Sequence, residues 1–157
     1  MKVDISDAKI SMDPEETLVT YALGSCIGVC FYDPVRRIGA MLHCLLPDSA
    51  RDALHATENP FMFADTGLAL LLERLLSLGA NKRRLQVTVA GGARRSANTV
   101  RHLDIGNQNY LAIRKALWRG GLLIRAEDVG GTTPRTMLLK IADGSVTLQS
   151  QGRRWEL

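Results

Sequence analysis

The chain has 157 residues, of which 46% are hydrophobic and 23% are charged. This length and composition fit one globular domain with its own hydrophobic core, so we interpret residues 1–157 as a single domain. No segment reaches the roughly 20 apolar residues that a membrane span requires. Residues 1–16 lack the apolar run of a targeting signal. We therefore expect a cytoplasmic protein that does not insert into membranes.

Lys and Arg outnumber Asp and Glu by 20 to 16, and much of the excess lies in the short runs 82–84, 94–95 and 153–154. This charge predicts a modest preference for acidic partners. Nucleic acid is one such partner, but only 5% of the residues are aromatic, and no basic run contains the stacking side chains of single-strand binders. We therefore expect no nucleic-acid partner and interpret the basic runs as solvated loop edges.

The first half of the chain predicts a β-hairpin followed by a helix. Residues 18–23 and 26–32 are apolar runs typical of strands. Asp33-Pro34 then supplies turn chemistry before a third apolar run at 38–46, so the hairpin should turn near residue 35. In residues 63–78 the leucines recur at helical spacing, and Gly79 suits the helix end.

The second half predicts one more helix and several strands. Residues 85–90 alternate like a strand, and residues 110–119 have helical spacing. Residues 122–129, 137–142 and 145–149 are further strands, with Asp143-Gly144 indicating a two-residue hairpin turn. Hairpins outnumber crossover units, so the predicted fold class is α+β: an α/β sandwich with a mostly antiparallel sheet and two principal helices on one face.

The three cysteines, Cys26, Cys30 and Cys44, are too few and too unevenly spaced for a secreted disulfide framework. Together with His43 they include zinc-ligand types. However, four residues of strand separate Cys26 from Cys30 by about 13 Å, whereas the ligands of one zinc lie within about 4 Å of each other. We therefore expect reduced thiols, no metal and no cofactor, with Cys30 in the core.

Cys26 and His43 are predicted to be neighbours in the first hairpin. A turn bounded by Tyr32 and Ile38 places them opposite or diagonal on one face, with Cβ atoms about 4.5–8 Å apart. An imidazole at this range can activate a thiol. The pKa of a free thiol is about 8.5, and a neighbouring imidazolium lowers this pKa.

The two residues that precede Cys26, Gly24 and Ser25, would support such a nucleophile. Gly24 lets the chain turn sharply, and backbone N–H groups near Gly24 and Ser25 could hold an oxyanion. The alternative is that Cys26 and His43 are structural, since cysteine is among the most buried residue types and a histidine in an apolar run is often a core residue.

Several segments closely resemble the CheD family of chemoreceptor glutamine deamidases. The resemblance covers nearly the whole chain. Its residues are Thr20-Tyr21-Ala22-Leu23-Gly24-Ser25-Cys26-Ile27-Gly28-Val29-Cys30, Tyr32-Asp33-Pro34, Gly39-Ala40-Met41-Leu42-His43-Cys44-Leu45-Leu46-Pro47, the helix at 65–78 with Gly79-Ala80, Gly91-Gly92-Ala93, Ile105-Gly106 with Asn109, Asp128, Gly130-Gly131 and Arg135.

The resemblance implies that Cys26 attacks the carboxamide of selected glutamines on methyl-accepting chemotaxis receptors, releasing ammonia and leaving glutamate, in chemotaxis adaptation. His43 would act as general base and then acid, and Thr20 would orient it, as a catalytic base requires. It also implies a fold similar to the catalytic domain of the cytotoxic necrotizing factor toxins, methyl-ester hydrolysis in some systems, and a CheC-type phosphatase as a further partner.

One loop departs from the family's pattern. Thr132-Thr133-Pro134 follows the double glycine where members usually carry Gly-Arg, and proline removes a backbone N–H. This change affects partner surfaces more than thiol chemistry. The candidate partner-binding residues are Arg94, Gly130, Gly131 and Arg135.

Selectivity for particular glutamines must come from surface around the pocket, for which segment 48–64, with Arg51, His55 and Asn59, and loop 94–98 are further candidates. We expect His55 and His102 to be solvated. The alternative function is a non-catalytic binding module that contacts receptors or a CheC-type phosphatase.

Overall fold

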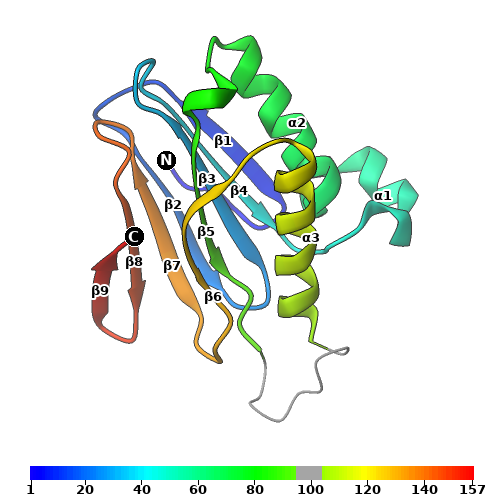
Figure 1. Ribbon diagram of the computed structural model, residues 1–157. Coiled ribbons are helices and arrows are strands. Elements are labelled where there is room, and N and C mark those ends of the chain that lie inside the picture. Colours follow the sequence, from blue (N-terminus) through cyan, green and yellow to red (C-terminus); the bar gives the residue numbers. More distant parts are fainter. Residues whose placement is uncertain (95–103) are drawn as a thin grey trace.

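The computed structural model describes residues 1–94 and 104–157, whose strands form two sheets packed face to face (Figure 1). The five-stranded sheet has the order β1-β4-β3-β5-β6, and the four-stranded sheet has the order β2-β7-β8-β9. The strands of the first are β1 (Asp7–Ser11), β3 (Ile27–Asp33), β4 (Ile38–Cys44), β5 (Gln86–Gly91) and β6 (Ile124–Val129). Those of the second are β2 (Thr17–Leu23), β7 (Arg135–Lys140), β8 (Val146–Ser150) and β9 (Arg153–Glu156).

Helices α2 (Ala64–Ser77) and α3 (Ile105–Arg119) cover the outer face of the five-stranded sheet, and the short helix α1 (Ala53–Glu58) lies beside α2 (Figure 1). In the connections of the described ranges lie three single-turn 3₁₀ segments, Ser49–Arg51, Pro60–Met62 and Lys82–Arg84. The result is three layers with two apolar cores. One core lies between the helices and the five-stranded sheet, and the other lies between the two sheets.

Strands β3 and β4 are buried at every position because both faces of this hairpin are covered. Alternate residues therefore enter different cores, as the pleat of a strand requires. Val29 and Phe31 face the helices, whereas Cys26 and Cys30 face the four-stranded sheet. This alternation places the Cys26 thiol in the layer between the sheets.

The sequence correctly predicts the fold class and the central hairpin. The sheets are mostly antiparallel, with β5 and β6 as the parallel pair, and the first hairpin turns between Asp33 and Ile38. No helix within residues 1–94 and 104–157 is long and apolar enough to cross a membrane.

Several element boundaries were wrong. Helix α3 begins at Ile105 rather than at residue 110, because the Asp104 carboxylate caps it by accepting from the Asn107 N–H at 3.2 Å. The predicted two-residue turn at 143–144 is longer: the Gly144 N–H bonds the Lys140 carbonyl and the Lys140 N–H bonds the Ser145 carbonyl. The edge strands β1 and β9 were missed, and the basic pair Arg153 and Arg154 lies in β9 rather than in a loop.

Candidate active site

Cys26 lies in the bend that connects β2 to β3. Before this bend, β2 has a bulge in which Ala22 takes a φ of 54°. Tyr21 and Ala22 both point outward, and Leu23 returns to the core. A bulge inserts one extra residue and re-aims the side chains around it. It therefore lets Thr20 and Leu23 both face inward although they are three positions apart.

The bend is fixed by the segment that follows β5. The Ala93 N–H donates to the Gly24 carbonyl at 2.7 Å, and the Gly92 N–H donates to the Cys26 carbonyl at 2.8 Å. Gly91 must be glycine, since it has a φ of 113° and a Cβ there would clash with the Cys26 carbonyl oxygen. The double glycine thus brings the end of β5 against the nucleophile bend.

Asn109, from α3, holds the same bend from the helix side. Its Nδ2 donates to the carbonyls of Ser25 and Leu45, both at 2.9 Å. These two donor bonds fix the amide orientation, because a flipped amide would place Oδ1 against two carbonyl oxygens. The side chain is completely buried, and its Oδ1 has no hydrogen-bond partner. Asn109 therefore joins the start of β3 to the end of β4.

His43 faces the same inter-sheet layer as Cys26. It pairs with Gly28 across the β3–β4 ladder, and Cys26 lies two positions before Gly28, just ahead of β3, so it occupies the diagonal position. Diagonal neighbours in an antiparallel pair have Cβ atoms about 7–8 Å apart or somewhat less. The register agrees with the arrangement expected from the hairpin turn.

Thr20 contacts His43 directly across the two sheets. The Thr20 Oγ1 lies 2.7 Å from His43 Nδ1 and also donates to the Val3 carbonyl at 2.8 Å. Thr20 and His43 are 0% and 1% exposed, and His43 Nε2 has no hydrogen-bond partner. One ring nitrogen is therefore held by threonine and the other is unpaired.

Burial shifts the pKa of both groups toward their neutral forms. Burial raises the pKa of the Cys26 thiol, which its own backbone N–H partly opposes. Burial also lowers the pKa of His43 to about 4, against the opposing charge of Asp4. At neutral pH His43 is thus an uncharged base. The expected imidazolium that would lower the thiol pKa is not the resting state of this pair.

The other two cysteines differ from Cys26 in exposure. Cys26 is 8% exposed, whereas Cys30 and Cys44 are 1% and 0% exposed. Burial raises the pKa of Cys30 strongly and that of Cys44 to about 12. All three thiols are free, and the part of the chain that the structure describes contains no metal-ligating cluster.

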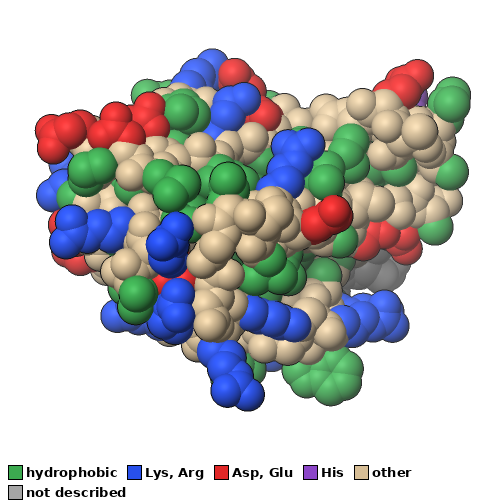
Figure 2. All heavy atoms as spheres, turned by 90° about the horizontal axis from the view of Figure 1, so that it is seen from above, with side chains coloured by type: hydrophobic (Ala, Val, Ile, Leu, Met, Phe, Trp, Pro, Cys, Tyr) green, Lys and Arg blue, Asp and Glu red, His purple; other side chains and the backbone are tan. Residues whose placement is uncertain are grey.

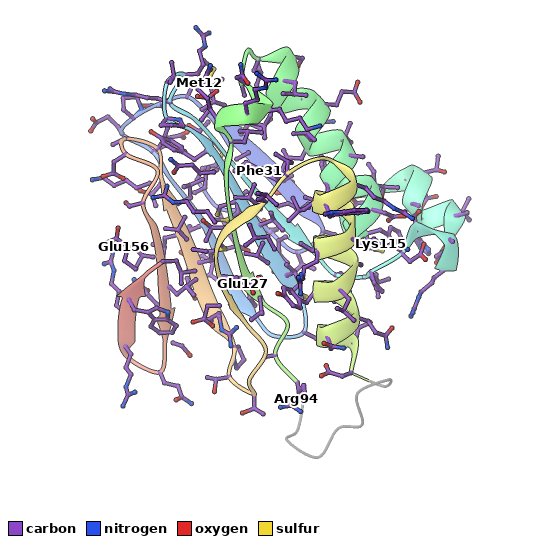
Figure 3. All side chains as sticks on the ribbon, viewed as in Figure 1. Met12, Phe31, Arg94, Lys115, Glu127 and Glu156 are labelled. Carbon is purple, nitrogen blue, oxygen red and sulfur yellow. The ribbon has the colours of Figure 1, made fainter. Side chains whose placement is uncertain are left out.

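The four predicted partner-binding residues gather at the end of β5, close to the Cys26 bend. The Arg94 N–H donates to the Gly131 carbonyl at 2.8 Å, and the Gly130 N–H donates to the Gly91 carbonyl at 2.9 Å. Figure 3 shows Arg94 at the lower end of the molecule, where its side chain lies 3.9 Å from Asp104.

Arg135 is buried and occupied by its own loop. Its guanidinium donates to four carbonyls, those of Gly91, Asp128, Gly130 and Thr133, and lies 3.2 Å from the Asp128 carboxylate. Pro134 is held through its carbonyl, which accepts from Ser150. The Arg135 side chain therefore shapes this loop rather than presenting a free charge to a partner.

The remaining candidates are engaged in other contacts or lie outside the described part of the chain. His55 is exposed and pairs with Asp52 at 2.6 Å, and Asn59 donates to the Ser6 carbonyl. Arg51 bonds Gln108 of α3. Loop residues 95–98 and His102 are outside the described residues.

The opposite end of the molecule offers a contrast. Viewed there, acidic and basic side chains are interspersed (Figure 2). An apolar groove of about 580 Å³ between α2 and α3 is lined by leucines such as Leu68, Leu72 and Leu76, without a cysteine or histidine. The thiol and the unpaired imidazole nitrogen occur together only at the Cys26 bend among the residues described.

Comparisons with known proteins identify the family of the chain. The family described as "CheD chemotactic sensory transduction" matches residues 45–150. A protein of Solibacter usitatus named "Probable chemoreceptor glutamine deamidase CheD" is 49% identical over 155 residues, covering 99% of this chain and 91% of the relative. A protein of Syntrophus aciditrophicus named "Probable chemoreceptor glutamine deamidase CheD 1" is 45% identical, covering 96% of this chain and 93% of the relative.

A solved structure, the Bacillus licheniformis hypothetical protein YfiH, superimposes with a TM-score of 0.47 at 15% identity, covering 77% of this chain and 49% of that one. This likeness is too low to support a conclusion. The sequence relatives, in contrast, extend over nearly the full length of both chains. The chain belongs to the CheD family.

Proposed function

We propose that this protein is a chemoreceptor glutamine deamidase, a protein-glutamine glutaminase in which Cys26 is the nucleophile and His43 the base. The observation that carries the proposal is the unpaired His43 Nε2, buried in the same inter-sheet layer as the least buried thiol of the chain. The printed names of the relatives give the same activity for them.

In the first half of the reaction, His43 Nε2 takes the proton from Cys26 Sγ, and the sulfur attacks the carbon of a glutamine side-chain amide. The amide oxygen becomes an oxyanion. The backbone N–H groups of Ser25 and Cys26 are suited to hold it, since no other residue in the described chain accepts a hydrogen bond from either. His43 then gives its proton to the nitrogen of the former amide, and the C–N bond breaks. Ammonia departs, and the substrate remains attached to Cys26 as a thioester.

In the second half, water attacks the thioester carbon while His43 Nε2 accepts a proton from it. The C–S bond breaks, Cys26 regains its proton from His43, and the product is glutamate. A neutral imidazole is needed at the start of each half. The low pKa of His43, about 4, supplies that form throughout the neutral range.

Selected glutamines on the cytoplasmic helical bundle of methyl-accepting chemotaxis receptors are the proposed substrates, and adaptation in the cytoplasm is the proposed role. The loop cluster of Arg94, Gly130 and Gly131 is the proposed contact surface for receptor or for a CheC-type phosphatase, with Arg135 shaping it. We also propose that the chain is a single domain and that its fold is similar to the catalytic domain of the cytotoxic necrotizing factor toxins. Both points are drawn from the sequence resemblance.

The test is incubation of the protein with a receptor cytoplasmic fragment, followed by mass spectrometry of its glutamine-containing peptides and an ammonia assay. We expect gains of about one mass unit at a few glutamines, with equal release of ammonia. Cys26→Ala should abolish both, while Cys30→Ala should retain both.

The binding-module alternative makes the opposite prediction. If Cys26→Ala restored adaptation fully in cells lacking the protein, contact alone would be sufficient and the deamidase proposal would fail. Loss of adaptation in Cys26→Ala, with the fragment still bound, would support catalysis.

A further inference from the structure

The protonation state of His43 can be derived from the hydrogen bonds around Thr20. A hydroxyl has a single proton to donate, and Thr20 Oγ1 has two neighbours within hydrogen-bond range. These are the Val3 carbonyl at 2.8 Å and His43 Nδ1 at 2.7 Å. A carbonyl oxygen can only accept, so the threonine proton must point to Val3.

The Val3 carbonyl needs this proton because the residue is 1% exposed and no other described residue donates to that oxygen. An unpaired buried carbonyl costs about 1–3 kcal/mol. With its proton directed at Val3, Thr20 Oγ1 can only accept from the imidazole. His43 Nδ1 must then carry the ring proton, and Nε2 is left with its lone pair.

The N-terminal segment is well placed to enforce this arrangement. The Val3 N–H donates to the Val19 carbonyl at 2.8 Å, and the Val19 N–H donates to the Met1 carbonyl at 2.9 Å. Both bonds are made by Val19, which precedes Thr20 on β2. They therefore fix the Val3 carbonyl relative to the Thr20 hydroxyl. The side chain of Val3 also packs in the inter-sheet core.

We propose that the backbone carbonyl of Val3 is a positioning group that sets the tautomer of His43 through Thr20. Without this acceptor, the Thr20 hydroxyl is free to donate to Nδ1, and the ring proton moves to Nε2. That tautomer cannot take the proton of Cys26. The inference rests on the proposed function for its catalytic consequence, but the tautomer itself is independent of any activity.

The first measurement is ¹⁵N NMR of the unmodified protein with labelled histidine, because a protonated and an unprotonated ring nitrogen have well-separated shifts. We expect His43 Nδ1 protonated and Nε2 unprotonated at pH 7. A protonated Nε2 would overturn the proposal even if the protein proved to be an active deamidase. Conversely, the expected tautomer in a protein without deamidase activity would leave this inference standing and remove only the proposed function.

The second measurement replaces the Val3 carbonyl with a thioamide, which is a poor acceptor. Residues 1–25 can be made as a peptide and joined to a chain that begins with Cys26 by ligation at that cysteine. The matched control is a thioamide at the exposed Ile5. We expect the Val3 thioamide to shift the ring proton toward Nε2 and to lower kcat about tenfold with KM unchanged, and the Ile5 control to do neither.

Thr20→Val separates positioning from simple destabilisation. If Val3 acts through Thr20, the thioamide should cause no further loss of kcat in the Thr20→Val background. Multiplied losses in the double variant, or an unchanged tautomer in the Val3 thioamide, would contradict the proposal.

Discussion

The two ends of β3 solve the burial of polar groups in opposite ways. At the Asp33 end, one fully buried carboxylate accepts five hydrogen bonds: from the N–H groups of Val35, Arg36 and Asn81 and twice from the Arg84 guanidinium. At the Cys26 end, His43 Nε2 and Asn109 Oδ1 are buried without partners. The hydrogen bonds of the buried carboxylate are saturated at the Asp33 end, whereas two buried polar atoms lack partners at the Cys26 end, which we call the incomplete end of β3.

The difference separates structural from chemical roles. A buried charge whose hydrogen bonds are all made holds the chain in place. Burial alone would raise the pKa of Asp33, but hydrogen bonds from Arg84, Asn81, Arg36 and Val35 lower it to about 2. An unpaired buried nitrogen contributes nothing to stability and is costly to keep. Such a group is expected where a reaction needs it. Substitutions at the two ends should therefore affect different quantities.

The largest expected effect is on catalysis at the Cys26 end. Replacing Cys26 with Ala should lower kcat by at least about 10⁴-fold, as loss of a nucleophile does in other hydrolases. The free energy of unfolding should change by only about 1 kcal/mol, because the side chain is small. Ammonia release and urea unfolding measure the two quantities. A variant that loses both equally would show that Cys26 is a structural residue.

The next effect is on stability at the Asp33 end. Asp33→Asn removes the charge that Arg84 pairs with at 2.9 Å, while most of the side-chain volume is kept. We expect a loss of about 3 kcal/mol in unfolding free energy, at the low end for a broken buried pair since Arg84 is partly exposed. The kcat of the folded variant should stay within about twofold of the parent's. A large fall in kcat without loss of stability would break the division between the two ends.

Burial of neutral His43 predicts a pH dependence of stability. The pKa of His43 is about 4 in the folded protein, below its ordinary value of 6.5. The unfolded chain therefore binds a proton first as the pH falls, so stability is lost between about pH 6.5 and pH 4, by about 3 kcal/mol. His43→Asn should flatten this part of the curve in denaturant titrations at several pH values. An unchanged slope in the variant would contradict the lowered pKa of His43, because it would mean that the folded and unfolded chains bind this proton equally.

The smallest effect is expected at Asn109, which clamps the bend from outside the reacting groups. Asn109→Leu leaves the Ser25 and Leu45 carbonyls without their donor, which should cost about 1–3 kcal/mol. We also expect a modest fall in kcat with little change in KM, since the bend would loosen. Asn109→Asp keeps the side-chain shape but loses the amide group that donates to both carbonyls, so it should also be impaired. If only Asn109→Leu were impaired, side-chain shape rather than the hydrogen bonds would be responsible.

The sequence predicts this molecule best where pattern and chemistry coincide. Turn residues and apolar alternation placed the first hairpin, and its register made Cys26 and His43 neighbours. The edge strand β9 has one apolar residue, Trp155, and therefore no apolar alternation, so it was missed. The contact of Thr20 with Val3 is invisible in any pattern, because the acceptor is a backbone carbonyl brought across the sheets by the fold. The sequence resemblance singled out Asn109 but predicted no role for it. Its role depends on hydrogen bonds to two backbone carbonyls, which a sequence pattern does not reveal.

The central claim is that the incomplete end of β3 performs covalent chemistry through Cys26. It is tested most directly by acid-quenching the protein during turnover of a receptor fragment and mapping the cysteine peptides by mass spectrometry. The account predicts a substrate adduct on the Cys26 peptide that hydroxylamine releases, as it does a thioester, and none on the peptides of Cys30 or Cys44. Deamidation that continued in Cys26→Ala, or an adduct on another cysteine, would contradict it.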